Sequence, residues 1–146
     1  MTVITFLKKY VLYLAWFQAL TATLSSLFFS EVLKFPPCVL CWYQRMCLYP
    51  ITVILAVGIL RKDTKVDYYV WPFLIAGWLI ALYHNLLYYS ILPEAAAPCI
   101  AGISCTTRFI EWFGFITIPL LSLSAFTILG VFMIIYRKVN NYDTGN

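Results

Sequence analysis

The first candidates for chemistry are two cysteines, Cys38 and Cys41, in the segment PPCVLCWYQR at residues 36–45. A Cys-x-x-Cys pair can hold a metal, staple a loop or exchange electrons through a disulfide. A staple across so short a loop adds little stability. Pro36 and Pro37 indicate the start of a helix, where the helix dipole and nearby cations favour the reactive thiolate. The pair is therefore a candidate redox centre.

Three further cysteines complete the set of five. Cys99 and Cys105 stand close together in the segment APCIAGISC, and Cys47 lies in the apolar run that follows the first pair. Four cysteines permit three pairings, of which Cys38 with Cys41 and Cys99 with Cys105 is the simplest. Cys47 is expected to be a small buried apolar residue. The sequence thus offers two dithiol–disulfide couples.

Four long apolar runs must position these residues. They cover residues 10–29, 39–60, 68–92 and 113–136. Apolar residues make up 63% of the 146-residue chain and charged residues only 11%, whereas a soluble domain has roughly 25% charged residues. Each run has about the 20 residues that cross a bilayer as a helix, which satisfies the backbone internally. The sequence therefore predicts an all-α membrane protein, a four-transmembrane-helix bundle forming one domain over residues 1–146.

Basic residues set the expected orientation of this bundle. Seven lie on one side of it: Lys8, Lys9, Arg61, Lys62, Lys65, Arg137 and Lys138. Three lie on the other side: Lys34, Arg45 and Arg108. Lysine and arginine are in excess on the cytoplasmic side, so both termini are predicted to be cytoplasmic and the loops at 30–38 and 93–112 to face outward. Topology and anionic lipid explain the net charge of +4, and nucleic acid is not an expected partner.

A zinc site is a rival use of the four loop cysteines, because a structural zinc ion takes four nitrogen or sulfur ligands. The oxidising exterior opposes it, since disulfides form and persist there. The predicted outer loops also contain no histidine. We therefore expect no metal.

Two polar residues lie inside the predicted helices. Arg45 follows Cys41 by four residues on the same helix face. Because a charge in lipid is costly, Arg45 is expected to face the interior beside a thiolate or the oxygen of an electron acceptor; the alternative is an arginine reaching the headgroups. His84, the only histidine, is predicted roughly 12 Å below the outer end of the third helix. It is either a hydrogen-bonded interior residue or a proton donor to a reduced acceptor.

Taken together, these features resemble the bacterial DsbB family of thiol–quinone oxidoreductases, in particular its short BdbC-type members. The markers are PCVLCWYQR heading the second predicted helix, YHNLL in the third, the second cysteine pair, and GFITIPLLSL opening the fourth. The resemblance covers nearly the whole chain. Such proteins lie in the bacterial cytoplasmic membrane, reoxidise an extracytoplasmic thioredoxin-fold, DsbA-like thiol oxidase, and pass two electrons to a membrane quinone. The resemblance therefore implies a quinone cofactor, ubiquinone or menaquinone.

The resemblance also implies a role for each site residue. The second cysteine pair would receive electrons from the partner oxidase, with Cys99 forming the mixed disulfide. The electrons would pass to the first pair, where Cys41 would contact the quinone. Arg45 would lie by the quinone headgroup, and His84 matches a family histidine near that site. The helix start favours Cys38 as the thiolate, but Arg45 and the resemblance together favour Cys41.

Two other functions stay open. Vitamin K epoxide reductase-like enzymes are also four-helix membrane proteins with a quinone-linked Cys-x-x-Cys, but in them that pair follows the loop pair, whereas here it comes first. The second alternative is a non-enzymatic membrane protein whose disulfides only staple two outer loops. In that protein the loss of Cys41 would harm stability, and no quinone would be reduced.

Overall fold

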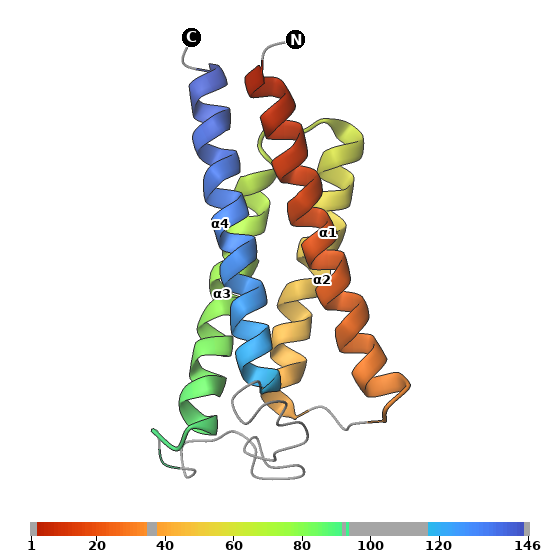
Figure 1. Ribbon diagram of the computed structural model, residues 1–146, viewed down its shortest axis with the longest axis vertical. Coiled ribbons are helices and arrows are strands. Elements are labelled where there is room, and N and C mark those ends of the chain that lie inside the picture. Colours follow the sequence, from red (N-terminus) through yellow and green to blue (C-terminus); the bar gives the residue numbers. More distant parts are fainter. Residues whose placement is uncertain (1–2, 35–37, 92, 94–116, 145–146) are drawn as a thin grey trace.

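The computed structural model describes residues 3–34, 38–91, 93 and 117–144 (Figure 1). Within these ranges the chain forms helices and no strand. The helices are α1 (Val3–Glu31), α2 (Val39–Arg61), α3 (Val66–Tyr88) and α4 (Ile118–Thr144). All four are long and apolar enough to cross a membrane. The predicted four-helix, all-α membrane fold is confirmed, and the protein is a multi-pass membrane protein.

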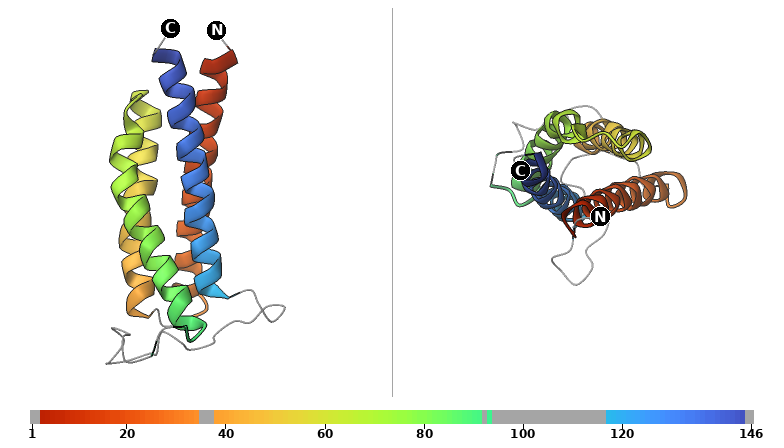
Figure 2. Two further views of the ribbon diagram at one scale, coloured as in Figure 1. Left: turned by 90° about the vertical axis from the view of Figure 1, so that its left-hand side faces the viewer. Right: turned by 90° about the horizontal axis from the view of Figure 1, so that it is seen from above.

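The helices run alternately up and down the bundle and form a ring (Figures 1 and 2). α1 and α3 each pack against both α2 and α4. The start of α1, the end of α4 and the turn from α2 to α3 lie at one end, which we call the terminal end. The start of α2 and the end of α3 lie at the opposite end, which we call the cysteine end. This up-and-down order places residues from different helices at the same depth.

Small residues let the helices approach closely, as is usual between helices in lipid. Ala15 and Ala81 are fully buried. Gly77 on α3 lies against the ring of Phe126 on α4, where an added β carbon would come within 2.6 Å of the ring Cζ atom. Large apolar side chains such as Phe17 and Leu79 instead lie on the outer surface. That surface suits a solvent of lipid tails, which are as apolar as leucine.

A tight turn joins α2 to α3 at the terminal end. Lys62 ends α2 with a positive φ of 54°, and the Asp63 carboxylate accepts a hydrogen bond of 2.8 Å from the Lys65 backbone N–H. Gly58, one turn earlier, lies directly against Val66, so a β carbon there would come within 2.9 Å of the Val66 Cβ atom. The absence of a side chain at Gly58 therefore allows α3 to begin close to α2.

The helix ends differ from the apolar runs. α3 ends at Tyr88, before the predicted end at residue 92, and Ser90 takes a positive φ of 56° beyond it. His84 is therefore only about 6 Å below the end of its helix at a rise of 1.5 Å per residue, closer to the cysteine end than predicted. α1 and α4 extend past their apolar runs at the terminal end. The predicted start of the fourth helix at residue 113 lies outside the described residues.

Candidate redox site

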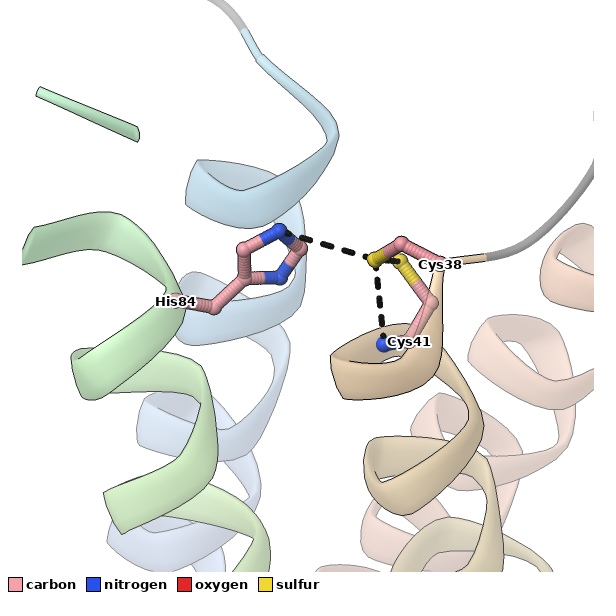
Figure 3. A group of neighbouring side chains, drawn as sticks. All are labelled: Cys38, Cys41 and His84. Carbon is pink, nitrogen blue, oxygen red and sulfur yellow. Dashed lines mark hydrogen bonds between the residues drawn. The ribbon is translucent and has the colours of Figure 1, made fainter. Parts of the chain in front are cut away.

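Cys38 and Cys41 lie together at the start of α2 (Figure 3). Cys38 is the N-cap residue, and its Sγ atom accepts a hydrogen bond of 3.3 Å from the Cys41 backbone N–H. The two Sγ atoms are 2.8 Å apart, whereas a disulfide bond measures roughly 2.05 Å. A small rotation of either side chain would bring the sulfurs to bonding distance, and a two-electron oxidation would then close the bond. The cap geometry thus brings the two sulfurs within reach of each other.

His84 reaches this pair from the neighbouring helix α3 (Figure 3). Its Nε2 atom lies 3.8 Å from the Cys38 Sγ atom, and its Nδ1 atom lies 3.3 Å from Nε2 of Gln44 on α2. His84 is 2% exposed and Cys38 7% exposed. The buried imidazole therefore faces the sulfur of Cys38. This contact supports the prediction that His84 is a hydrogen-bonded interior residue. A role for His84 in proton transfer stays a prediction.

Hydrogen bonds at the helix start favour a thiolate on Cys38. They lower the pKa of the Cys38 thiol from 9.0 to about 4. The largest cause is the side-chain hydrogen bond from Cys41, and a hydrogen bond from His84 adds to it, while burial acts in the opposite direction. A thiolate at a helix N-terminus is also favoured by the helix dipole. The geometry therefore favours Cys38, where the sequence reasoning had preferred Cys41 as the thiolate.

Arg45 is buried, with 9% of its surface exposed. Its Nη2 atom donates a hydrogen bond of 2.8 Å to the backbone oxygen of Ser26 on α1, and its guanidinium carbon lies 5.7 Å from the centre of the Trp42 ring. The prediction that this charge faces the bundle was right, but its observed partner is a carbonyl oxygen of α1 rather than a thiolate. Arg45 therefore joins α2 to α1, while His84 joins the cysteine pair to α3.

Three polar residues at this site were not singled out from the sequence. Ser122 on α4 donates a hydrogen bond of 2.6 Å to Oε1 of Gln44. Asn85, beside His84 in the chain, donates bonds of 2.8 Å to the backbone oxygens of Ala81 and Pro119, which fixes the first turn of α4 near the site. The sequence did contain a signal for Gln44 and Asn85, because an amide side chain inside a membrane helix is costly unless it has a hydrogen-bond partner. Gln44 and Asn85 stand in the motifs QR and YHNLL.

Of the three remaining cysteines, the structure describes one. Cys47 packs against the apolar core on α2, as expected of a small apolar residue, but it is half-buried rather than buried. Cys99 and Cys105 lie outside the described residues, as does Arg108. The structure therefore describes the first cysteine pair and its surroundings but not the second pair.

Cys38, Cys41 and His84 could also be considered as metal ligands, because their sulfur and nitrogen atoms lie within 4.8 Å of one another. Tetrahedral zinc with Zn–S bonds of roughly 2.3 Å separates two sulfur ligands by roughly 3.8 Å. The two sulfurs are only 2.8 Å apart. This spacing suits a bond between the sulfurs better than two bonds to one ion.

The comparisons with known proteins agree with this chemistry. Residues 8–136 match the family model of the disulfide bond formation protein DsbB. The chain belongs to the DsbB family. It is 44% identical over 126 residues to disulfide bond formation protein C of Bacillus subtilis (strain 168), covering 86% of this chain and 91% of that protein.

Two further relatives are also named as probable disulfide formation proteins. Probable disulfide formation protein C 1 of Bacillus anthracis is 41% identical over 133 residues, covering 90% of this chain and 96% of that protein. Probable disulfide formation protein of Metapseudomonas resinovorans is 43% identical over 129 residues, covering 88% and 90%. No solved structure matches the chain. Membership in the DsbB family makes the protein a disulfide-forming membrane oxidoreductase.

Proposed function

We propose that this DsbB-family protein reoxidises an extracytoplasmic thioredoxin-fold dithiol oxidase and passes the electrons to a membrane quinone. The observation that carries the proposal is the pair Cys38–Cys41, capping a membrane-spanning helix with its sulfurs 2.8 Å apart. A disulfide at that position lies at the boundary between an aqueous phase, which holds a protein partner, and the lipid, which holds a quinone. Family membership and the relatives' role in disulfide formation support the proposal.

Electrons enter through the second cysteine pair in this proposal. The partner's thiolate attacks the Cys99–Cys105 disulfide and forms a mixed disulfide with Cys99. The partner's second thiolate then resolves this bond, so that the partner leaves as a disulfide and the loop pair becomes a dithiol. Thiol–disulfide exchange proceeds through such mixed disulfides, and the loop dithiol reduces the Cys38–Cys41 disulfide by the same exchange.

The first pair then returns to the disulfide. The Cys38 thiolate forms the S–S bond with the Cys41 sulfur, and the pair loses two electrons and the one proton of the Cys41 thiol. A quinone held beside Arg45 would be the electron acceptor, and the second proton needed for the quinol would come from solvent. As a whole residue Cys41 is partly exposed and Cys38 is buried, which supports the assignment of Cys41 as the residue that faces the quinone. Cys38, more deeply buried and bonded to His84, is the thiolate that closes the bond.

The residues around Arg45 fit a quinone headgroup. Among the described residues, the guanidinium makes one hydrogen bond, to Ser26, although it carries five N–H groups. The remaining donors match the carbonyl oxygens of a quinone. An open groove of about 560 Å³ lies on α1 between Leu24 and Val32; it is lined by neighbours of Ser26 in the chain, and neither Ser26 nor Arg45 lines it. Its lining is mostly apolar, which suits a ring that arrives from the lipid.

The orientation of the bundle is also part of this proposal. The basic residues Lys8 on α1, Arg137 on α4, and Lys62 and Lys65 in the α2–α3 turn belong to the terminal end. The excess of basic residues supports a cytoplasmic position for that end, and in this proposal the cysteine end faces outward, where disulfides persist. Membership in the DsbB family argues against the vitamin K epoxide reductase-like class and also against the non-enzymatic staple, and the staple is the rival function that quinone reduction tests directly.

Steady-state quinone reduction distinguishes these two functions. The purified protein in detergent is given a reduced thioredoxin-fold dithiol oxidase and a soluble quinone, and quinol formation is followed by absorbance. We expect catalytic turnover with ubiquinone or menaquinone analogues. A folded sample that reduces neither class of quinone with several such dithiol partners would instead support a structural role for the disulfides.

A further inference from the structure

A chain of hydrogen bonds connects three helices to the redox pair. Ser122 on α4 bonds to Oε1 of Gln44 on α2 at 2.6 Å, and Nε2 of Gln44 lies 3.3 Å from Nδ1 of His84 on α3. Nε2 of His84 lies 3.8 Å from Sγ of Cys38. Gln44 is 7% exposed. A buried amide with both its oxygen and its nitrogen bonded has a fixed orientation.

The chemistry of these groups gives the chain a direction. An amide nitrogen only donates hydrogen bonds, so Gln44 Nε2 donates and His84 Nδ1 accepts. A neutral imidazole that accepts at one nitrogen carries its proton on the other. The proton of His84 therefore lies on Nε2, which is the atom that faces Cys38 (Figure 3). Ser122 supports this arrangement, because its hydroxyl donates to Oε1 and holds the amide oxygen away from the imidazole.

We propose that Gln44 and Ser122 are positioning residues that select the Nε2–H tautomer of His84, so that the imidazole donates to the Cys38 thiolate. Neither residue touches the sulfurs in this account; both act through His84. The opposite tautomer would place a lone pair against the thiolate and destabilise the reduced pair. Only the consequence for catalysis rests on the proposed function, because the tautomer itself is a property of the folded protein.

Nitrogen NMR tests the tautomer directly. His84 is the only histidine of the chain, so protein labelled with ¹⁵N-histidine shows the ring nitrogens of this residue alone. In the reduced wild-type protein we expect a protonated Nε2 and an unprotonated Nδ1. A protonated Nδ1, in the neutral ring or the imidazolium, would overturn the proposal.

Substitutions of Gln44 sharpen this test. Gln44→Leu removes the donor, and we expect the wild-type pattern to be replaced by a mixture of protonation states. Gln44→Glu has nearly the same shape but offers only acceptors as a carboxylate, so we expect Nδ1 to become protonated. If the wild-type pattern persisted in both variants, Gln44 would not select the tautomer. Circular dichroism verifies that each variant is folded. Substitutions of Ser122 give a second test, with smaller expected changes in the spectrum.

The serine variants include matched controls. Ser122→Ala should broaden or shift the His84 signals, whereas Ser122→Thr, which keeps the hydroxyl, should restore the wild-type pattern. Ser124→Ala serves as the control on the same helix, because the Ser124 hydroxyl bonds to the Leu121 backbone oxygen, away from this chain. Equal spectra for Ser122→Ala and Ser124→Ala would remove Ser122 from the proposal.

The kinetic consequence is measured separately. We expect Gln44→Leu to lower kcat of quinone reduction about tenfold, the size of one hydrogen bond to a charged group. KM for the quinone should stay unchanged, because Arg45 and the α1 groove are untouched. An unchanged kcat would contradict the kinetic role. If the wild-type protein itself reduced no quinone, the proposed function would fail while the spectra still decided the tautomer.

Discussion

Buried polar side chains have different hydrogen-bond partners at the two ends of the bundle. At the cysteine end, Gln44, His84 and Ser122 form a chain of hydrogen bonds that leads to a sulfur. At the terminal end, Asp67 is 1% exposed, and its Oδ2 atom lies 3.9 Å from Nε of the half-exposed Arg137. Its other oxygen has no hydrogen-bond partner among the described residues.

The difference indicates separate tasks for the two ends. At the terminal end, side chains of α4 donate to the backbone of the α2–α3 turn: Tyr136 to the Asp63 oxygen at 3.4 Å and Asn140 to the Thr64 oxygen at 3.0 Å. These bonds hold helices together and lead to no reactive group. We therefore expect substitutions at the cysteine end to change chemistry and those at the terminal end to change stability.

The largest effect is expected from Cys41→Ser. It removes one of the two sulfurs of the redox pair, so quinone reduction should fall to the uncatalysed background while the helices stay inserted and folded. Turnover is measured by quinol absorbance, and helix content by circular dichroism. Cys47→Ser is the matched control on the same helix and should keep full turnover. Residual turnover in Cys41→Ser close to the wild-type rate would exclude the pair as the redox centre.

Arg45→Ala should produce the next largest effect. Losing hydrogen bonds from a charged group, each worth about 1.5–3 kcal/mol, should raise the apparent KM for quinone roughly tenfold to a hundredfold. Arg137→Ala removes an arginine at the terminal end and should leave this KM unaltered. The comparison between the ends breaks down if both variants raise KM equally, or if Arg45→Ala changes neither KM nor rate.

The pH dependence of the Cys38 thiolate provides a third test. A pKa lowered to about 4 means that the thiolate is present above that pH and is lost as the pH falls through it. His84→Phe removes one of the hydrogen bonds that lower this pKa, so the midpoint should move upward and turnover should fall several-fold. The ultraviolet absorbance of the thiolate, titrated in the reduced protein, reports the midpoint. A midpoint near 9 in the wild-type protein would contradict the assignment.

Gly58→Ala should have the smallest effect on chemistry. Its β carbon would press on Val66, and such overpacking costs about 1–3 kcal/mol, while the better helix propensity of alanine returns up to about 1 kcal/mol. We expect a modest loss of thermal stability, measured by circular dichroism in detergent, with unchanged turnover below the transition. A loss of turnover in the folded variant would show that the two ends are coupled.

The sequence predicted the four helices and the reactive cysteine pair, but it did not predict the contacts between the helices. Continuous apolar runs predict the four spans because the bilayer fixes their length, and the spacing of Cys38 and Cys41 depends on one helix start. The partner of Arg45 could not be predicted in this way. Helical spacing places Arg45 one turn below Cys41, but whether it faces α1 or α3 depends on how α2 is rotated within the ring.

The hydrogen-bond chain could not be predicted from the sequence either, because it also depends on how the helices pack against one another. Gln44 and Ser122 are 78 residues apart, and their contact requires α4 to pass beside the start of α2. The depth of His84 was misjudged because the apolar run continues past Tyr88, where the helix already ends. Apolar composition marks what lies in lipid, whereas a helix end depends on local backbone conformation, such as the positive φ at Ser90.

A single-turnover experiment tests the central claim most directly. In a protein with Cys99→Ser and Cys105→Ser, the thiols that remain are Cys38, Cys41 and Cys47. This protein is reduced, freed of reductant and mixed with a soluble quinone, and quinol and free thiols are counted. The account predicts one quinol for each pair of thiols lost, with Cys47 still free, because the couple exchanges two electrons. Retention of all thiols without quinol formation would contradict it.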